Sequence, residues 1–134
     1  PATAVASIEK AIETTSGNDG LQFNIALNYG SRAEITRAAS RLCRKVEEGM
    51  LKADDITDEM LSREMYTGDE NGNIPDPDLI IRTSGEERLS NFLLWQAAYS
   101  EFAFTDTLWP DFTPEEFERM IEEFSTRGRR FGGR

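Results

Sequence analysis

Apolar side chains recur along this chain with two different periods. Residues 3–15 carry them at helical spacing, and residues 21–27 alternate apolar with mostly polar side chains, which predicts a helix followed by a strand. A second helix is predicted to begin with the capping box Ser31-Arg32-Ala33-Glu34 and to end near Gly49. The apolar face of this second helix is expected to consist of Ile35, Ala38, Ala39, Leu42, Cys43 and Val46.

The remainder of the chain continues to alternate helix with strand. Thr57 is expected to cap a shorter helix, and residues 91–99 predict another. Short apolar runs at 79–82 and 101–104 predict strands, and Thr113 followed by Pro114 predicts the start of the last helix. The helix capped by Thr57 is expected to carry the apolar residues Met60, Leu61 and Met65. The last helix is expected to bury Phe117, Met120, Ile121 and Phe124. Strands separated by helices predict an α/β fold, a parallel β-sheet with surrounding helices and right-handed crossovers.

Composition narrows the class of protein. The 134 residues suit one domain, with 38% hydrophobic and 30% charged side chains, as in soluble globular proteins. No internal boundary or repeat divides the chain, which predicts a single domain or half of one. The one cysteine, Cys43, excludes a disulfide framework within the chain and is expected to be buried. A net charge of −10 argues against general nucleic-acid binding, and no apolar run is long enough to span a membrane.

The segment from Asp78 to Asn91 carries the candidate chemistry. Arg82 ends the predicted strand at its carboxyl end, where open α/β sheets bind ligands, and Arg88 and Ser90 follow across a tight loop. Guanidinium forks and a short hydroxyl donor suit an anion with several oxygens, such as a diphosphate. Two interpretations are open at this point. The arginines bind such an anion, or they pair with Glu86, Glu87 and Asp78 in a solvated loop.

Two further features have the same kind of ambiguity. Glu101 enters a hydrophobic strand, where a carboxylate forms a salt bridge with an arginine or helps to hold a magnesium ion. The last ten residues contain four arginines and no acid, so the tail is a solvated end or an arm that reaches a diphosphate. Sequence alone favours the salt bridge at Glu101 and is evenly balanced for the tail.

Four segments together resemble one enzyme family. They are residues 78–102, the Asn-Tyr-Gly-Ser-Arg run at 28–32, with Ser31 where the family usually has Gly, the Leu-Trp-Pro-Asp-Phe run at 108–112 and the Arg-Arg-Phe-Gly-Gly run at 129–133. These segments closely resemble the cis-prenyltransferases, the family of undecaprenyl diphosphate synthase. The resemblance covers the chain from about residue 21 to its end and is far more specific than a short glycine motif.

The resemblance implies a reaction and a role for particular residues. Cis-prenyltransferases condense isopentenyl diphosphate with an allylic prenyl diphosphate, using Mg²⁺. By resemblance, Arg82, Arg88 and Ser90 grip the isopentenyl diphosphate, Leu89 adds its backbone amide, and Glu101 helps to place the magnesium. The resemblance also implies a cytoplasmic homodimer with peripheral membrane contact through its product. Its tail residues Arg130, Gly132 and Gly133 are implied to reach the diphosphate site of the other subunit.

The family's early segment is absent from this sequence. That segment, His-x-Met-Asp-Gly-Asn-x-Arg-Trp, supplies the Asp that engages the allylic diphosphate, whereas this chain has no histidine and begins at Pro1. The chain is therefore expected to be the carboxy-terminal half of a longer enzyme and inactive alone. The alternative is a non-catalytic partner subunit, which the missing Asp permits and the intact Arg82, Arg88 and Ser90 set disfavours. A generic anion-binding module would leave the Trp-Pro-Asp-Phe segment unexplained.

Overall fold

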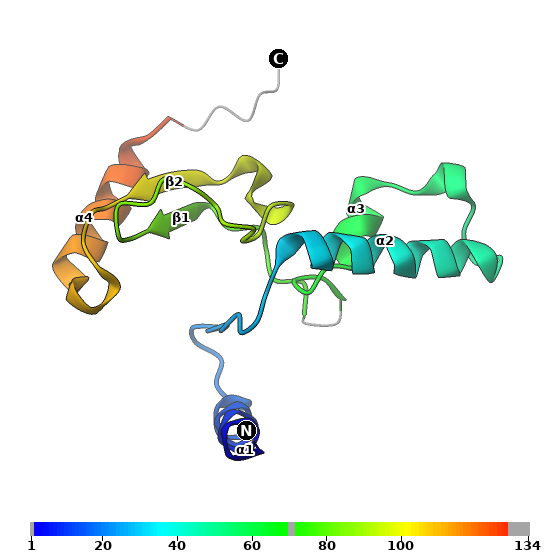
Figure 1. Cartoon of the computed structure of the whole chain (residues 1–134), viewed down its shortest axis with the longest axis horizontal. Coiled ribbons are helices and arrows are strands. Elements are labelled where there is room, and N and C mark those ends of the chain that lie inside the picture. Colours follow the sequence, from blue (N-terminus) through cyan, green and yellow to red (C-terminus); the bar gives the residue numbers. More distant parts are fainter. Residues whose placement is uncertain (1, 70–71, 129–134) are drawn as a thin grey trace.

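A computed structural model describes residues 2–69 and 72–128 of the chain. Figure 1 shows the two strands and the last helix at one end of the molecule, the second and third helices at the other, and the first helix standing apart from both. No helix in the described ranges is long and apolar enough to cross a membrane. The helices and strands are α1 Ala2–Thr15, α2 Ser31–Glu47, α3 Asp58–Arg63, β1 Leu79–Arg82, β2 Glu101–Phe104 and α4 Pro114–Thr126, with 3₁₀ helices at Ala53–Asp55, Gln96–Tyr99 and Trp109–Asp111.

The two strands form a parallel pair, which confirms the predicted α/β fold with a parallel sheet. Leu79 lies opposite Glu101, and Arg82 lies opposite Phe104. Backbone hydrogen bonds continue the pairing at both ends, from Glu101 N to Asp78 O (2.9 Å) and from Thr105 N to Arg82 O (3.0 Å). Because the strands are parallel, the loops that follow their carboxyl ends lie at the same edge of the sheet.

The predicted helix caps are confirmed at two helices and wrong at a third. The hydroxyl of Thr57 accepts from Met60 N and that of Thr113 accepts from Glu116 N, both at 3.2 Å. At α2 the N-cap residue is Gly30, which has no side chain with which to cap the helix. Ser31 is already inside the helix and its hydroxyl is used elsewhere, so the predicted capping box does not form. Gly49 ends the helix as predicted, with a φ of 71°.

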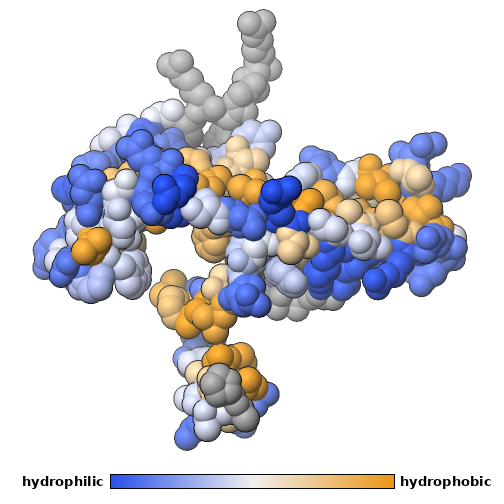
Figure 2. Space-filling model, viewed as in Figure 1, coloured by the Kyte–Doolittle hydropathy of each residue, from blue (hydrophilic) through white to orange (hydrophobic). Residues whose placement is uncertain are grey.

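Two predicted elements are wrong. Residues 21–27 form no strand, and the side chains of Leu21 and Phe23 are 91% and 79% exposed. A strand needs a neighbour for its backbone groups, and the sheet in the described ranges contains only β1 and β2. Figure 2 shows the exposed apolar surface of residues 21–27 below the main body of the molecule. Residues 91–99 are helical only as the short turn Gln96–Tyr99, because Asn91 and Leu93 have positive φ angles that interrupt a helix.

The core is small and partly polar. Its buried apolar side chains are Ala38, Leu42, Met65, Ala97, Ala103 and Met120. Cys43 is exposed, so its predicted burial is wrong. The buried face of α2 consists of Ser31, Glu34, Ala38 and Leu42. Cys43 follows Leu42 and therefore lies about 100° further round the helix, away from this face. On α4, Met120 is buried as predicted, whereas Phe117 and Ile121 are exposed.

A buried carboxylate joins α2 to the end of α3. Glu64 forms ion pairs with Arg41 and Lys45 of α2, while its own side chain is almost inaccessible to solvent. Burial by itself would raise the pKa of Glu64, but the hydrogen bonds from Lys45 and Arg41 more than offset it and lower the pKa below its ordinary value of 4.5. The charged form is therefore favoured in the folded protein.

This carboxylate predicts a loss of stability in acid. A folded-state pKa below the unfolded one stabilises the protein above about pH 4.5, and the contribution disappears as the pH falls through the folded-state pKa. We expect the free energy of unfolding to decline below pH 4.5 and the decline to be shallower in Glu64→Gln. Urea unfolding between pH 3 and pH 6 measures both slopes. Glu118→Gln, at an exposed position of α4, is the control, and an equal change of slope in both variants would contradict the assignment.

Candidate functional site

The two predicted arginines meet at one carboxylate. Arg82 ends β1 and its Nη2 pairs with Oε2 of Glu86, while Nη2 of Arg88 pairs with Oε1 of the same side chain. The arginine side chains are 27% and 65% exposed, so Arg82 is the more enclosed of the two. The structure thus contains the ion pairs of the solvated-loop interpretation, and at the same time gathers both guanidiniums around one anion.

A surface pocket of about 470 Å³ lies beside Arg82, at the carboxyl end of β1. The predicted residues Arg82 and Leu89 line it, whereas Arg88 and Ser90 do not. Arg88 is linked to the pocket wall through Glu86, and Ser90 is exposed with a φ of 48°. The lining residues are Ile80, Ile81, Arg82, Thr83, Ser84, Glu86, Leu89 and Phe92.

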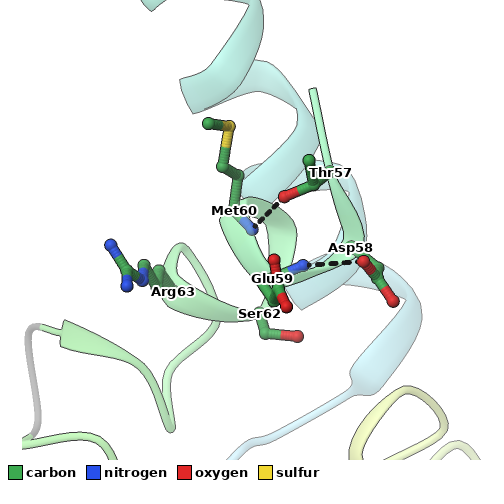
Figure 3. Close-up of a pocket in the computed structure, with 6 residues that line it drawn as sticks. All are labelled: Thr57, Asp58, Glu59, Met60, Ser62 and Arg63. Atoms are coloured by element: carbon green, nitrogen blue, oxygen red, sulfur yellow. Dashed lines mark hydrogen bonds between the residues drawn. The ribbon is translucent and has the colours of Figure 1, made fainter. Parts of the chain in front are cut away.

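A larger pocket of about 660 Å³ lies around α3 and has different chemistry. Figure 3 shows that two of its polar side chains bond the first turn of the helix, since Thr57 accepts from Met60 N and Asp58 accepts from Glu59 N. The hydroxyl of Ser62 accepts from Nε1 of Trp95 at 2.9 Å. Arg63 points away from the contacts of Thr57 and Asp58 in the same view. We therefore take the smaller pocket, which carries the converging arginines, as the candidate site.

The loop after β1 is fixed to the loop after β2. Ser84 N donates to Thr107 O and Gly85 N donates to Thr105 O, both at 2.9 Å. Gly85 has a φ of 66°, and a Cβ there would lie 2.8 Å from Oδ1 of Asp106, so this position requires glycine. Backbone pairing of this kind holds Arg82 and Glu86 at the edge of the sheet.

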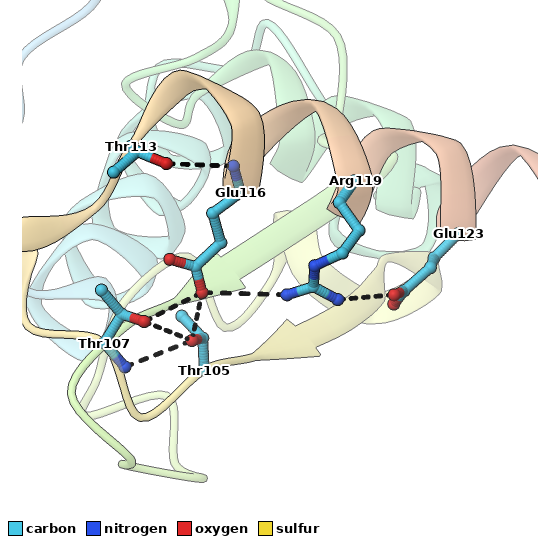
Figure 4. A network of polar contacts seen from close by, with 6 residues as sticks. All are labelled: Thr105, Thr107, Thr113, Glu116, Arg119 and Glu123. Carbon is cyan, nitrogen blue, oxygen red and sulfur yellow. Dashed lines mark hydrogen bonds and ion pairs between the residues drawn. The ribbon is translucent and has the colours of Figure 1, made fainter.

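Glu116 of α4 supports that second loop. Figure 4 shows its Oε1 between the hydroxyls of Thr105 and Thr107, which donate at 2.6 Å and 2.9 Å. Arg119 lies 3.8 Å from the same oxygen and also pairs with Glu123. The helix that follows β2 therefore anchors the two threonines whose carbonyls hold the arginine-bearing loop.

Glu101 lies at the other end of the sheet. It begins β2 opposite Leu79, three residues before the level of Arg82, which is a distance of about 10 Å along the strands. Its side chain is 25% exposed and pairs with Nη1 of Arg127 at 2.9 Å, and the same nitrogen donates to Phe102 O. The salt bridge favoured by the sequence is thus present. In the described ranges no three His, Cys, Asp or Glu side chains gather in a way that could hold a metal ion.

Sequence reasoning missed a buried carboxylate whose partner, Tyr29, packs against the pocket residue Phe92. Glu34 is fully buried and accepts from Tyr66 N (2.7 Å), from Nε2 of Gln96 (3.1 Å) and from the hydroxyl of Tyr29. Burial, followed by the hydrogen bond to Glu34, raises the pKa of Tyr29 to about 12. The only sequence signal was the position of Glu34 three residues after Ser31, which was interpreted as a capping box.

The predicted tail contacts involve the last residues of the chain. Arg130, Gly132 and Gly133 lie outside the described residues. Arg127, four residues after Glu123 on the same terminal segment, is described and reaches back to β2 through Glu101. The tail's predicted contact with a diphosphate stays a prediction.

Comparison with known proteins shows which family this chain resembles. The chain matches the family described as "Putative undecaprenyl diphosphate synthase" over residues 1–132. The isoprenyl transferase of Bacillus subtilis (strain 168) is 53% identical over 133 residues, covering 99% of this chain and 50% of the relative. That of Agrobacterium fabrum is 58% identical over 125 residues, covering 93% and 49%. The chain thus spans about half the length of these curated relatives.

Two solved structures share the fold. Lavandulyl diphosphate synthase from Lavandula x intermedia, solved in complex with dimethylallyl diphosphate, has a TM-score of 0.92 at 38% identity, covering 99% of this chain and 56% of that one. A probable undecaprenyl diphosphate synthase from Campylobacter jejuni has a TM-score of 0.77 at 39% identity, covering 98% and 57%. Together with the family match over nearly the whole chain, these likenesses confirm the resemblance, and the chain belongs to the undecaprenyl diphosphate synthase family of prenyltransferases.

Proposed function

We propose that this chain is the carboxy-terminal part of an isoprenyl transferase, called the parent protein below. The parent condenses isopentenyl diphosphate with an allylic prenyl diphosphate and forms a longer Z-polyprenyl diphosphate. The observation that carries the proposal is the pair of guanidiniums of Arg82 and Arg88 on the two oxygens of Glu86, at the carboxyl end of a parallel strand. A diphosphate offers the same kind of paired oxygens to the same donors.

The proposed roles follow from the chemistry of the donors. Arg82 and Arg88 bind the isopentenyl diphosphate by charge-assisted hydrogen bonds, Leu89 donates its backbone amide, and the hydroxyl of Ser90 is a further donor. When the diphosphate binds, it replaces Glu86 as the anion between the arginines. The bound diphosphate holds the homoallylic alkene in place for its attack on the allylic carbon. Diphosphate leaves that carbon and a proton is lost, so this chain contributes positioning.

The direct test is a condensation assay on the parent protein. Labelled isopentenyl diphosphate is supplied with dimethylallyl diphosphate or longer allylic diphosphates, and the products are separated by chain length and by double-bond geometry. We expect label in Z-polyprenyl diphosphates. Absence of incorporation with every allylic diphosphate, from a folded parent protein, would refute the proposed activity.

Mg²⁺ is the cofactor of the proposed reaction, and Glu101 is its proposed ligand on this chain. A carboxylate oxygen that is partly exposed has the chemistry that Mg²⁺ prefers, and a magnesium ion usually keeps water and phosphate oxygens as its other ligands. The ion pair with Arg127 must open for this role. When bound, Mg²⁺ would neutralise charge on a diphosphate.

Glu101→Gln separates the metal role from the salt bridge. The substitution keeps the shape of the side chain and removes its charge, so we expect lower activity of the parent protein and a higher Mg²⁺ concentration for half-maximal rate. Arg127→Ala is the matched control, because it opens the same ion pair and leaves the carboxylate in place. If both variants lose only thermal stability, and added Mg²⁺ restores neither, Glu101 acts as a structural partner of Arg127.

The proposal also includes the assembly of the parent protein. We propose a cytoplasmic homodimer in which Arg130, Gly132 and Gly133 of one tail contact the diphosphate site of the other subunit. Peripheral membrane contact then comes through the apolar product. Glycines allow a backbone to approach phosphate oxygens closely, which supports this role for the end of the tail.

A further inference from the structure

Helix α2 begins without a cap of its own. Its N-cap residue, Gly30, has no side chain, so the first backbone N–H groups of the helix need acceptors from elsewhere. Asn91 supplies them from 59 residues further along the chain. Its backbone carbonyl accepts from Ser31 N at 2.8 Å, and its side-chain Oδ1 accepts from Arg32 N at 2.9 Å. One residue therefore caps the helix through both its backbone and its side chain.

A side chain of α2 also accepts a hydrogen bond from the segment that contains Asn91. The buried hydroxyl of Ser31 accepts from Leu94 N at 2.9 Å, so the segment that follows Asn91 is held as well. Gly30 leaves room for this arrangement, because a Cβ at that position would lie 2.8 Å from Nδ2 of Asn91. The first turn of α2 and residues 91–94 thus form one interlocked junction.

The backbone at this junction is in a conformation that it would not adopt by itself. Ser90, Asn91 and Leu93 have φ angles of 48°, 65° and 47°, all in the left-handed region. Asn tolerates this region better than other side chains, and Leu has neither that tolerance nor a polar group to offset the strain. Such a sequence of angles persists where surrounding contacts hold it. Here the hydrogen bonds from Ser31 N and Arg32 N of α2 hold Asn91 in this conformation.

The junction is continuous with the proposed diphosphate site. Asn91 follows Arg88, Leu89 and Ser90 directly. A backbone hydrogen bond from Phe92 N to Leu89 O (3.0 Å) closes the turn that contains Asn91, and both Leu89 and Phe92 line the pocket. A change in the φ of Asn91 would therefore turn the three preceding residues relative to Arg82.

We propose that Asn91 is a positioning residue of the isopentenyl diphosphate site. By capping α2 it fixes the left-handed turn at residues 90–91, and with it the orientation of Arg88, the Leu89 amide and the Ser90 hydroxyl relative to the pocket. This inference rests on the proposed function. It adds to that function a coupling between the N-terminal end of α2 and the loop at residues 88–90.

Three variants of the parent protein test the coupling. Asn91→Ala removes the side-chain cap and the tolerance of positive φ, whereas Asn91→Gly removes the side-chain cap and keeps that tolerance. Gly30→Ala leaves Asn91 in place and directs a methyl group at its Nδ2. For each variant we expect the KM for isopentenyl diphosphate to rise about fivefold or more, with the KM for the allylic substrate unchanged. Asn73→Gly, at another asparagine with positive φ, is the control and leaves both constants unchanged.

A double variant sharpens the test. Once Asn91 is Ala, the methyl group of Gly30→Ala no longer meets an amide, so the second substitution should add little to the first. Amide hydrogen exchange at Arg32 should quicken in the Asn91 variants whether or not the protein is active. Additive effects, equal changes in both KM values, or a loss of thermal stability alone would overturn the positioning role.

The two proposals fail in different ways. If Arg88→Ala leaves the KM for isopentenyl diphosphate unchanged, the proposed diphosphate site is wrong. If Arg88→Ala raises that KM and the Asn91 and Gly30 variants do not, the diphosphate site stands and the positioning role of Asn91 is refuted. Asn91→Gly and Gly30→Ala keep the question answerable if Asn91→Ala fails to fold.

Discussion

Arg88→Ala in the parent protein is expected to raise the KM for isopentenyl diphosphate about tenfold to hundredfold and to leave that for the allylic substrate nearly unchanged. A hydrogen bond to a charged group contributes about 1.5–3 kcal/mol, and each 1.4 kcal/mol corresponds to a factor of ten. Arg88 is more exposed than Arg82 and is tied to Glu86 in the free protein. Its loss should therefore weaken the grip on the diphosphate without disturbing β1.

A matched control separates this effect from a general loss of positive charge. Arg44 is an exposed arginine of α2 that lies outside the pocket lining, so Arg44→Ala removes the same charge away from the site. It should leave both KM values within about twofold of the parent values, because an exposed surface charge contributes little. Steady-state kinetics with each substrate varied in turn gives the comparison. Equal increases in both KM values for Arg88→Ala would remove Arg88 from the isopentenyl diphosphate site.

Local sequence signals predicted the fold well where they acted within a few residues. Thr57 and Thr113 cap the helices that follow them, as their positions predicted. The apolar runs at β1 and β2 formed strands because each found the other as a parallel neighbour. At Ser31 the same kind of signal was misleading. Its hydroxyl accepts from Leu94, a residue 63 positions away, and nothing local in the sequence indicates that contact.

The segment at 21–27 shows a different limit. Its alternation is typical of a strand, but pairing is a property of two segments. In the ranges that the structure describes, no strand lies alongside it. Cys43 illustrates the same limit on a helix, because helical spacing predicts which residues share a face and not how wide a stripe the neighbours cover.

The candidate site shows the same difference between local features, which the sequence predicts, and long-range contacts, which it does not. The proximity of Arg82, Arg88 and Leu89 could be predicted because they lie in one short segment at the end of a strand. The sequence left open whether the arginines pair with acids or bind an anion, and the structure shows Glu86 as their partner in the free chain. Asn91 and Glu34 escaped notice because most of their contacts join residues 32 to 62 positions apart. Such contacts follow from tertiary packing and have no short-range pattern.

Glu34→Ala is expected to lower the free energy of unfolding by about 3 kcal/mol, since an orphaned buried donor costs about 1–3 kcal/mol. The carboxylate is fully buried and accepts from three donors, on Tyr29, Tyr66 and Gln96. Its removal leaves the Gln96 amide with Thr67 as its remaining described acceptor, beside an Oε1 atom that is buried and has no hydrogen-bond partner among the described residues. Water can reach the partly exposed tyrosines, which limits the loss. Glu34→Gln keeps an acceptor and should cost less.

The hydroxyl of Tyr29 reports on the same carboxylate. Burial and then the hydrogen bond to Glu34 raise its pKa to about 12, so the neutral form is favoured in the folded protein. Its contribution to stability is therefore complete below pH 10 and disappears as the pH rises through 12. In Glu34→Ala we expect the pKa of Tyr29 to fall toward 10, which ultraviolet titration measures against Tyr29→Phe. Urea unfolding gives the stability change, with Glu122→Ala on the exposed side of α4 as control. A loss below about 1 kcal/mol with an unchanged tyrosine titration would show that Glu34 does not hold these three donors in place.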